Sequence, residues 1–503
     1  MLRQRVLKSI YTNIFIKPLL VLFGLVGSAF VARILGAELL ATVGVIRALS
    51  TTLGVLSEMG LNRSLIRIIP DISISKGGNS SIRMAEKFRN VRVAMVTILA
   101  GLFVVFGFDK LEAYSPALSI SLGYVLAILM VYVTTQKYVL MASLKNYEIA
   151  KVDIVSAAIM PVFNVTFALA WGSPLLVVVS IIIVQGITVY LLNRIKYDLD
   201  MLAGVTHVDD LKKVILEYWK YISTNYIVSI FNRLLVRPAF IIWILIFFSI
   251  SAQDIGNTVV AMTIIYICWD IAILPTSQLR GVLLARFYAG SEEGRVVKLE
   301  KISAAAVAIS SSILAITVNI LGFDVLLALY GDAYSEGIQW GVNIATFALL
   351  GTAFSLGNSL LLQLDKFRYI FSAIIAGTLF MVTALVGLYG YSEGIKNIAP
   401  YVVFIVILTR IIFWLYTDVA AMRKSPHLGN MGIKIKAIFA TIVVIYAGSM
   451  IDIDGYAQTF MLYVGCILAF YIIIISMGGI GDERRKILSD IVSSKYHWIL
   501  RAI

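Results

Sequence analysis

The chain has 503 residues, of which 60% are apolar and only 14% are charged, and its mean hydropathy is +0.92. An ordinary soluble domain is about 25% charged, so a soluble protein of this composition would expose a large apolar surface. The composition excludes a disordered chain, a secreted disulfide scaffold and a cytosolic enzyme. It predicts an integral membrane protein with many spans, in which the net charge of +13 must be divided between two sides of a bilayer.

Fourteen apolar segments are long enough to cross a bilayer, which takes about 20 residues in a helix. We expect the first six spans at 11–33, 39–57, 92–108, 117–141, 152–171 and 174–192. Six more are expected at 223–249, 256–276, 303–322, 338–362, 369–390 and 398–417, and the last two at 434–451 and 458–478. The predicted fold class is therefore an all-α polytopic membrane protein, and Pro161, Pro238 and Pro275 can kink spans 5, 7 and 8.

The lysines and arginines predict the orientation of these spans. With both termini in the cytoplasm, 33 of the 42 fall in cytoplasmic segments, and the outer loops hold only Lys110 and Lys396, with Arg33 at a boundary. An excess of cations inside is the usual signature of topology. No clear cleavage site follows the first span, so it is predicted to be a retained helix. We expect a multi-pass protein of the cytoplasmic (inner) membrane.

A weak internal repeat relates the two halves of the chain. Residues 10–13 (IYTN) match 222–225 (ISTN), and the predicted outer turn at 36–41 resembles 252–257. Because six spans separate the copies, the repeat predicts two lobes related by a pseudo-two-fold axis along the membrane normal, with alternating access between them. The predicted domains are an N-lobe (1–195), a cytoplasmic linker (196–222), a C-lobe (223–418), and spans 13 and 14 with an amphipathic tail (419–503).

The sequence offers no pattern typical of a cofactor or metal site. The histidines at 207, 427 and 497 are isolated, and no P-loop motif is present. Cys268 and Cys466 lie in apolar runs and are read as small buried residues rather than as a disulfide. The predicted outer loops are short and leave no room for a folded catalytic domain, so we expect a transporter and not an enzyme.

The segment 32–70 resembles the opening of the polysaccharide-unit flippases (Wzx type, as in O-antigen biosynthesis), which belong to the multidrug/oligosaccharidyl-lipid/polysaccharide (MOP) exporter superfamily. The family's turn Leu-Gly-Pro-Glu-x-x-Gly corresponds to Leu35–Ala41, where Ala37 and Ala41 replace the proline and the final glycine. The family's Gly-Leu after span 2 appears as Gly60-Leu61, and its Arg-x-x-Pro ending as 67–70. The resemblance implies translocation of undecaprenyl-diphosphate-linked oligosaccharides from the inner to the outer leaflet, for surface polysaccharide.

Five cations within predicted spans are candidates to meet such a cargo. They are Lys17 in span 1, Arg47 in span 2, Arg233 and Arg237 in span 7, and Arg410 in span 12. An unpaired cation facing lipid costs about 2.5–3.5 kcal/mol on insertion scales, so these side chains are expected to face a cavity or a partner. Arginine presents a permanent charge and a planar fork of donors to phosphate oxygens. For Lys17, snorkelling to the cytoplasmic interface is an equal alternative.

The acids within spans are few and have two possible roles. Asp270 in span 8 is predicted to be the only acid well inside a span, where it either couples transport to an ion or neutralises an arginine. Lys137 is expected to snorkel or to pair with Asp153, because both lie toward the inner ends of adjacent spans.

Three functions remain open on the sequence. The leading prediction is a flippase with a cationic central cavity. Its expected partners are the lipid-linked oligosaccharide and the bilayer, with a polysaccharide polymerase and a chain-length regulator as further candidates, but no nucleic acid. The alternatives are a peptidoglycan-precursor flippase and an ion-coupled multidrug exporter of the same superfamily. The multidrug exporter is disfavoured because a cationic cavity repels a cationic drug.

Overall fold

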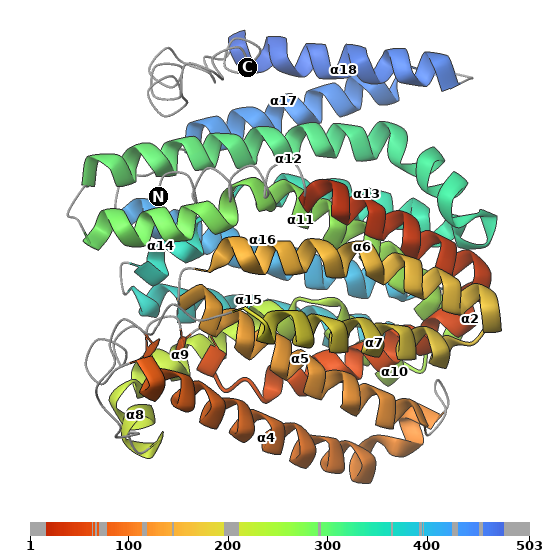
Figure 1. Cartoon of the computed structure of the whole chain (residues 1–503). Helices are drawn as coiled ribbons and strands as arrows, with labels where there is room; N and C mark the ends of the chain where they lie inside the picture. The colour runs from red at the N-terminus through yellow and green to blue at the C-terminus, as the bar shows by residue number, and fades with distance from the viewer. Residues whose placement is uncertain are drawn as a thin grey trace. The chain divides into compact units, whose positions relative to one another are not determined.

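The structure is a computed structural model that describes residues 17–476 apart from short segments. The segments left out are 63, 66–67, 70–77, 113–117, 143–144, 196–210, 290–292, 364–365, 392–394, 396, 425–430 and 452–455. Within the described residues all regular structure is helical (Figure 1). This confirms the predicted fold class of an all-helical polytopic membrane protein.

In the first half of the chain, the described residues form nine helical elements. They are α2 (Lys17–Leu56), α4 (Gly78–Glu112), α5 (Leu118–Ala142), α6 (Asn146–Trp171), α7 (Pro174–Asn193), α8 (Leu211–Glu217), α9 (Trp219–Ile230), the π-helix η3 (Phe231–Leu235) and α10 (Pro238–Phe247). The second half contains α11 (Ala252–Ala289), α12 (Glu293–Tyr330), the 3-10 turn η4 (Asp332–Tyr334), α13 (Ser335–Thr352), α14 (Gly357–Gln363), α15 (Phe367–Gly390), α16 (Ala399–Lys424), α17 (Met431–Ser449) and α18 (Tyr456–Ser476).

Within the described residues, each predicted span falls on a helix, on part of a helix, or on consecutive helices. Length and composition qualify ten of the described helices as membrane spans, or eleven if the bent pair at 221–247 counts as one. The count is below fourteen partly because α2 covers the first two predicted spans, while α18 enters only as a shorter apolar helix over Gln458–Ile474. Inside α2 the backbone breaks at Gly36 (φ 75°, ψ 170°), between the two predicted spans, where only glycine takes this conformation without strain.

The predicted kinks have mixed outcomes. Span 7 is broken, because α9 with η3 meets α10 at an angle of 61° directly before Pro238. Pro238 stands at the first position of α10, where its missing N–H costs no hydrogen bond. By contrast, α6 and α11 continue through Pro161 and Pro275. Arg237 precedes the proline in an extended conformation, as the residue before proline usually does.

The chain divides into two compact units. The first comprises residues 1–263, 329–337 and 379–407, and the second comprises 264–328, 338–378 and 408–503. The lobes and the pseudo-two-fold axis expected from the repeat stay predictions. One contact inside the first unit accords with them, since the two matched turns touch: a Cβ on Gly256 would lie 2.0 Å from the carbonyl oxygen of Ala37.

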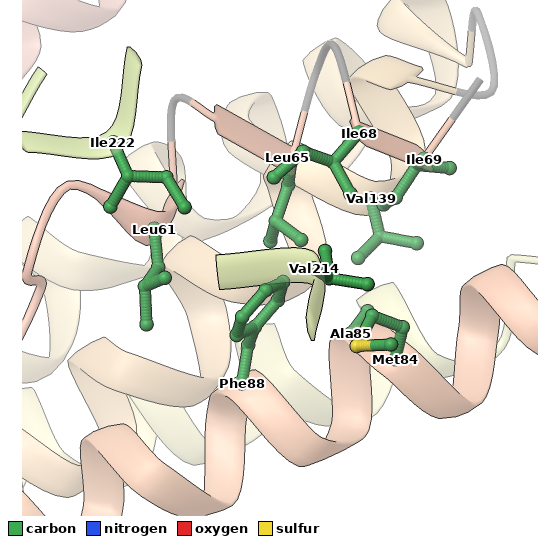
Figure 2. Close-up of a cluster of buried hydrophobic side chains, with 10 residues drawn as sticks. All are labelled: Leu61, Leu65, Ile68, Ile69, Met84, Ala85, Phe88, Val139, Val214 and Ile222. Carbon is green, nitrogen blue, oxygen red and sulfur yellow. The ribbon is translucent and has the colours of Figure 1, made fainter. Parts of the chain in front are cut away.

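Each unit has its own apolar core. In the first unit, Figure 2 shows a cluster of ten buried apolar side chains, which are Leu61, Leu65, Ile68, Ile69, Met84, Ala85, Phe88, Val139, Val214 and Ile222. This cluster joins the segment after α2 to α4, α5, α8 and α9. In the second unit, α12, α17 and α18 pack through small and branched side chains that include Cys466. Cys268 and Cys466 are both buried and free, as the sequence predicted.

Candidate functional site

The turn that ends α2 is pressed directly against α9. After Leu56 the chain turns through 57–60, with Met59 and Gly60 both at positive φ (47° and 74°). A Cβ on Gly60 would lie 2.0 Å from the carbonyl oxygen of Ile222 and 2.8 Å from the amide nitrogen of Tyr226. Glycine is required here both by the backbone conformation and by the close approach. The turn therefore holds Glu58 at a fixed place against α9.

One face of α9 and η3 receives the turn. Tyr226 donates a hydrogen bond to the carbonyl of Leu56 (3.0 Å), and Ser229 donates to Oε2 of Glu58 (3.3 Å). Arg233 donates from Nη1 to the same Oε2 and forms a salt bridge with it. The spacing of 226, 229 and 233 places these three side chains on a single helical face.

Glu58 is an acid without solvent contact. Its side chain is 0% exposed, whereas the side chain of Arg233 is 31% exposed. Among the described residues, Oε1 of Glu58 has no hydrogen-bond partner, so Oε2 receives both donors. A buried charge is tolerated only when it is paired and hydrogen-bonded. Arg233 is therefore the direct countercharge of Glu58, and its other side remains accessible.

A second arginine, Arg92 of α4, lies fully buried beside this pair. Its Nη1 donates to Asn62 Oδ1 (2.7 Å) and Thr135 Oγ1 (2.8 Å), and its Nη2 donates to the carbonyl of Gly54 (3.3 Å). Electrostatic interactions reach from Arg92 to both Glu58 and Arg233. All the described hydrogen bonds of Arg92 go to neutral acceptors, and none joins it to the carboxylate of Glu58. These neutral acceptors fix Arg92 in place.

We call Glu58, Asn62, Arg92, Ser229 and Arg233 the buried charge cluster. Two arginines and one carboxylate are the charged groups of this cluster. The described members therefore carry a net charge of +1 inside the protein. An interior with one excess positive charge favours an anion.

The other predicted cations lie in different surroundings. Arg47 is exposed on α2 although the described residues on either side of it, from 40 to 46 and from 48 to 50, are buried. Arg237 is partly buried and directly precedes α10. The bend between η3 and α10 lies between Arg233 and α10. Lys17 is the first residue of α2, but its side chain lies outside the described part of the structure.

Arg410 belongs to the second unit and has aromatic neighbours. Its guanidinium lies 4.2 Å from the ring centre of Trp269 and 4.7 Å from that of Trp414, and all three side chains are buried. Stacking of this kind stabilises a desolvated cation by about 2 kcal/mol. Arg410 thus has a packing role that the sequence did not predict.

The acids that the sequence analysis singled out, Asp153 and Asp270, have different surroundings. Lys137 and Asp153 form the expected salt bridge, with 2.6 Å between Nζ and Oδ1, and both are partly exposed. Asp270 is exposed on α11, whereas Glu58 is fully buried at the end of span 2. Ion coupling and a salt bridge both stay predictions for Asp270. Glu58 is a further buried acid, which the sequence analysis left outside span 2, in the following cytoplasmic segment.

Of the buried charge cluster, the sequence analysis singled out only Arg233 and missed the other two charged members, Glu58 and Arg92. Arg92 falls on the predicted edge of span 3 and was counted among cytoplasmic cations. A signal for Glu58 was present, since this acid, two residues before Gly60, interrupts a flank that otherwise carries mainly basic charge. Pairing across 175 residues, between Glu58 and Arg233, leaves no trace in a single sequence.

Comparisons with known proteins show the fold. No family model matches the chain, and no curated protein matches it. A solved structure titled "Lipid II flippase MurJ, inward closed conformation" matches with a TM-score of 0.68 at 12% identity, over 93% of this chain and 99% of that one. An inward-facing multidrug resistance MATE family transporter of the MOP superfamily matches with a TM-score of 0.56 at 12% identity, over 84% and 98%. The chain thus has the fold of the MOP-superfamily transporters.

Proposed function

We propose that the protein is a flippase that moves undecaprenyl-diphosphate-linked oligosaccharides from the cytoplasmic to the outer leaflet for surface polysaccharide. The observation that carries the proposal is the net positive charge of the buried charge cluster in a fold shared with MOP-superfamily transporters. The proposal includes alternating access through a cationic cavity, to which Lys17, Arg47, Arg233, Arg237 and Arg410 contribute to different degrees.

The diphosphate is the part of this cargo that most needs the protein. Its charges must leave water to cross the membrane, which is costly unless cations replace the water. A guanidinium has five N–H donors, and Arg233 keeps part of its surface accessible while Glu58 holds Nη1. Arg47 is exposed in a buried stretch of α2, which suits a second contact.

The charge of the site separates the candidate cargoes. A cationic drug needs acids or aromatic rings, and here the one buried acid of the cluster already has an arginine. A peptidoglycan precursor remains the second candidate, because the structure that matches with the higher TM-score is named a lipid II flippase. The two flippase functions differ in the glycan and are distinguished in cells.

The test is deletion of the gene in the source organism. We expect lipid-linked repeat units to accumulate in the cytoplasmic leaflet and the surface polysaccharide to disappear, while peptidoglycan synthesis continues. Normal surface polysaccharide in the deletion strain would refute the proposal, and arrest of peptidoglycan synthesis would favour the second candidate. Sensitivity to cationic dyes with intact glycan would favour a drug exporter.

The site is tested by complementation of that strain. Replacing Arg233 and Arg237 by alanine should abolish complementation, and adding Glu58→Gln to the double variant removes the unpaired acid that could prevent folding. Arg194→Ala is the matched control, since Arg194 is an exposed arginine stacked on Tyr190 away from the cluster. Full complementation by the triple variant at normal membrane levels would show that these arginines do not bind the cargo.

A further inference from the structure

We propose that Glu58 is a proton-binding site whose occupancy is linked to cargo: when a diphosphate group takes Arg233, Glu58 takes up one proton. The inference rests on the proposed function, because it concerns the same anionic cargo. It adds a proton to the transport cycle at a residue that the sequence did not single out. The chemistry recognised is a diphosphate, either free or at the head of a lipid.

Glu58 and an incoming diphosphate compete for the guanidinium of Arg233. Glu58 is 0% exposed and receives a hydrogen bond from Arg233, whose own side chain is 31% exposed. A diphosphate that reaches the accessible side of the guanidinium attracts it more strongly than one carboxylate does, because it carries more charge. If Arg233 turns toward the cargo, Oε2 of Glu58 loses its only direct countercharge among the described residues.

The segment that carries Arg233 is suited to such a turn. Arg233 lies in η3, a π-helical turn between α9 and α10 with a 61° bend after it. Single π turns inside helices are irregular and are often found at functional sites. By contrast, Glu58 is held by a turn that packs its backbone against α9. The arginine is therefore the partner that moves.

No other described charge replaces Arg233. The titratable groups that face Glu58 are Arg92 from α4 and Tyr226 from α9, with Tyr138 of α5 next to Arg92. Neutral acceptors hold both Nη atoms of Arg92, and these bonds would break if it moved to the carboxylate. Arg92 therefore stays with its neutral acceptors and does not take the place of Arg233.

The proton has a defined place. Without the Arg233 donor, a buried carboxylate is neutralised by protonation rather than left charged. A proton from the water that reaches Arg233 adds to Oε2 of Glu58, and the new O–H donates to Ser229 Oγ, which now accepts where it had donated. Arg233 stays charged throughout, so one proton enters for each diphosphate bound and leaves when Arg233 returns.

The experiment measures proton uptake on binding. The full-length protein in nanodiscs is titrated with inorganic pyrophosphate or with undecaprenyl diphosphate, by calorimetry in two buffers of different ionisation enthalpy. At pH 7 we expect the wild type to take up about one proton per ligand more than Glu58→Gln. Its affinity relative to Glu58→Gln should rise about tenfold per unit of falling pH, as for any binding linked to one proton. The probe that shows the effect identifies a free or a lipid-borne diphosphate.

Controls separate this inference from the proposed function. Glu148→Gln removes an exposed carboxylate from a salt bridge with Lys151 and should behave like the wild type. Binding of either probe with equal proton uptake in the wild type and Glu58→Gln would overturn the inference while leaving the flippase intact. If neither probe binds the wild type or any variant, the proposed function itself fails.

A second readout does not depend on the variant folding. Infrared difference spectra of the wild type should gain a protonated-carboxyl C=O band when the ligand is added. A spectrum without that band, at saturating ligand, would overturn the inference.

Discussion

Arg233→Ala should destabilise the protein far more than Glu58→Gln does. Removing Arg233 leaves a carboxylate that is 0% exposed, and breaking a buried ion pair from one side costs about 3–5 kcal/mol. Protonation limits this cost: a glutamate in water has a pKa of about 4.3, so adding a proton at pH 7 costs about 3.7 kcal/mol. Glu58→Gln leaves Arg233 in contact with water and keeps an acceptor, so it should cost about 1 kcal/mol.

The same reasoning fixes the pH dependence. At pH 7 the folded Arg233→Ala variant holds a proton on Glu58 that the unfolded chain releases, so its stability falls as pH rises. Between pH 7 and pH 6 the variant should therefore recover about 1.4 kcal/mol relative to the wild type. The recovery should vanish when Glu58→Gln is added.

The assay is reversible denaturant unfolding in mixed micelles, with the free energy of unfolding measured at both pH values for the wild type, the two single variants and the double variant. In the Glu58→Gln background, Arg233→Ala should cost about 1 kcal/mol. Equal costs for the two single variants, or an Arg233→Ala cost that does not change with pH, would refute the assignment of Glu58 as a charge balanced by Arg233.

Two further predictions concern packing and a second ion pair. Gly60→Ala should lower the free energy of unfolding by about 2–5 kcal/mol, because its Cβ would meet the carbonyl of Ile222; Gly54→Ala, with open space around its Cβ, should instead stabilise α2 by about 0.5–1 kcal/mol. Lys434→Met should cost about 3–5 kcal/mol, because it removes the cation that is bonded to Asp418 at 2.6 Å, with both side chains buried. A Lys434→Met, Asp418→Leu double variant as unstable as the single one would contradict this. Unfolding in micelles measures all four variants.

Apolar runs of about 20 residues predicted the helices well because burial in lipid is a local property of the sequence. The break before Pro238 was also predictable from local sequence, because a proline disrupts the hydrogen bonding of the helix that contains it. The boundary expected between spans 1 and 2 falls on Gly36, where the backbone leaves the helical conformation inside α2. Local signals therefore give the spans but not how consecutive spans join.

The site depends on contacts that are distant in sequence. Arg233 was singled out because an arginine in an apolar run demands an explanation, but its partner was not found. Glu58 lies just past Leu56, the end of the apolar run, so its composition resembles that of a loop. Only the close approach of Gly60 to α9 brings the carboxylate under Arg233. A charge at a span end is therefore ambiguous until its packing is known.

Of the contacts that α2 makes, the proposed anionic cargo can compete for one. Near its middle, the backbone at Ala37 meets Gly256, and near its end Trp243 donates a hydrogen bond to Thr52 (2.9 Å). Neither contact has a charge that a ligand could compete for. The bond between Glu58 and Arg233 does, and it joins α2 to the broken helix that begins the predicted C-lobe. If the lobes move as alternating access requires, an anionic cargo can weaken this contact directly, because it offers Arg233 another partner. The net charge of +13 is predicted mainly to orient the spans, whereas in the proposed function the pair of Glu58 and Arg233 couples the cargo to motion.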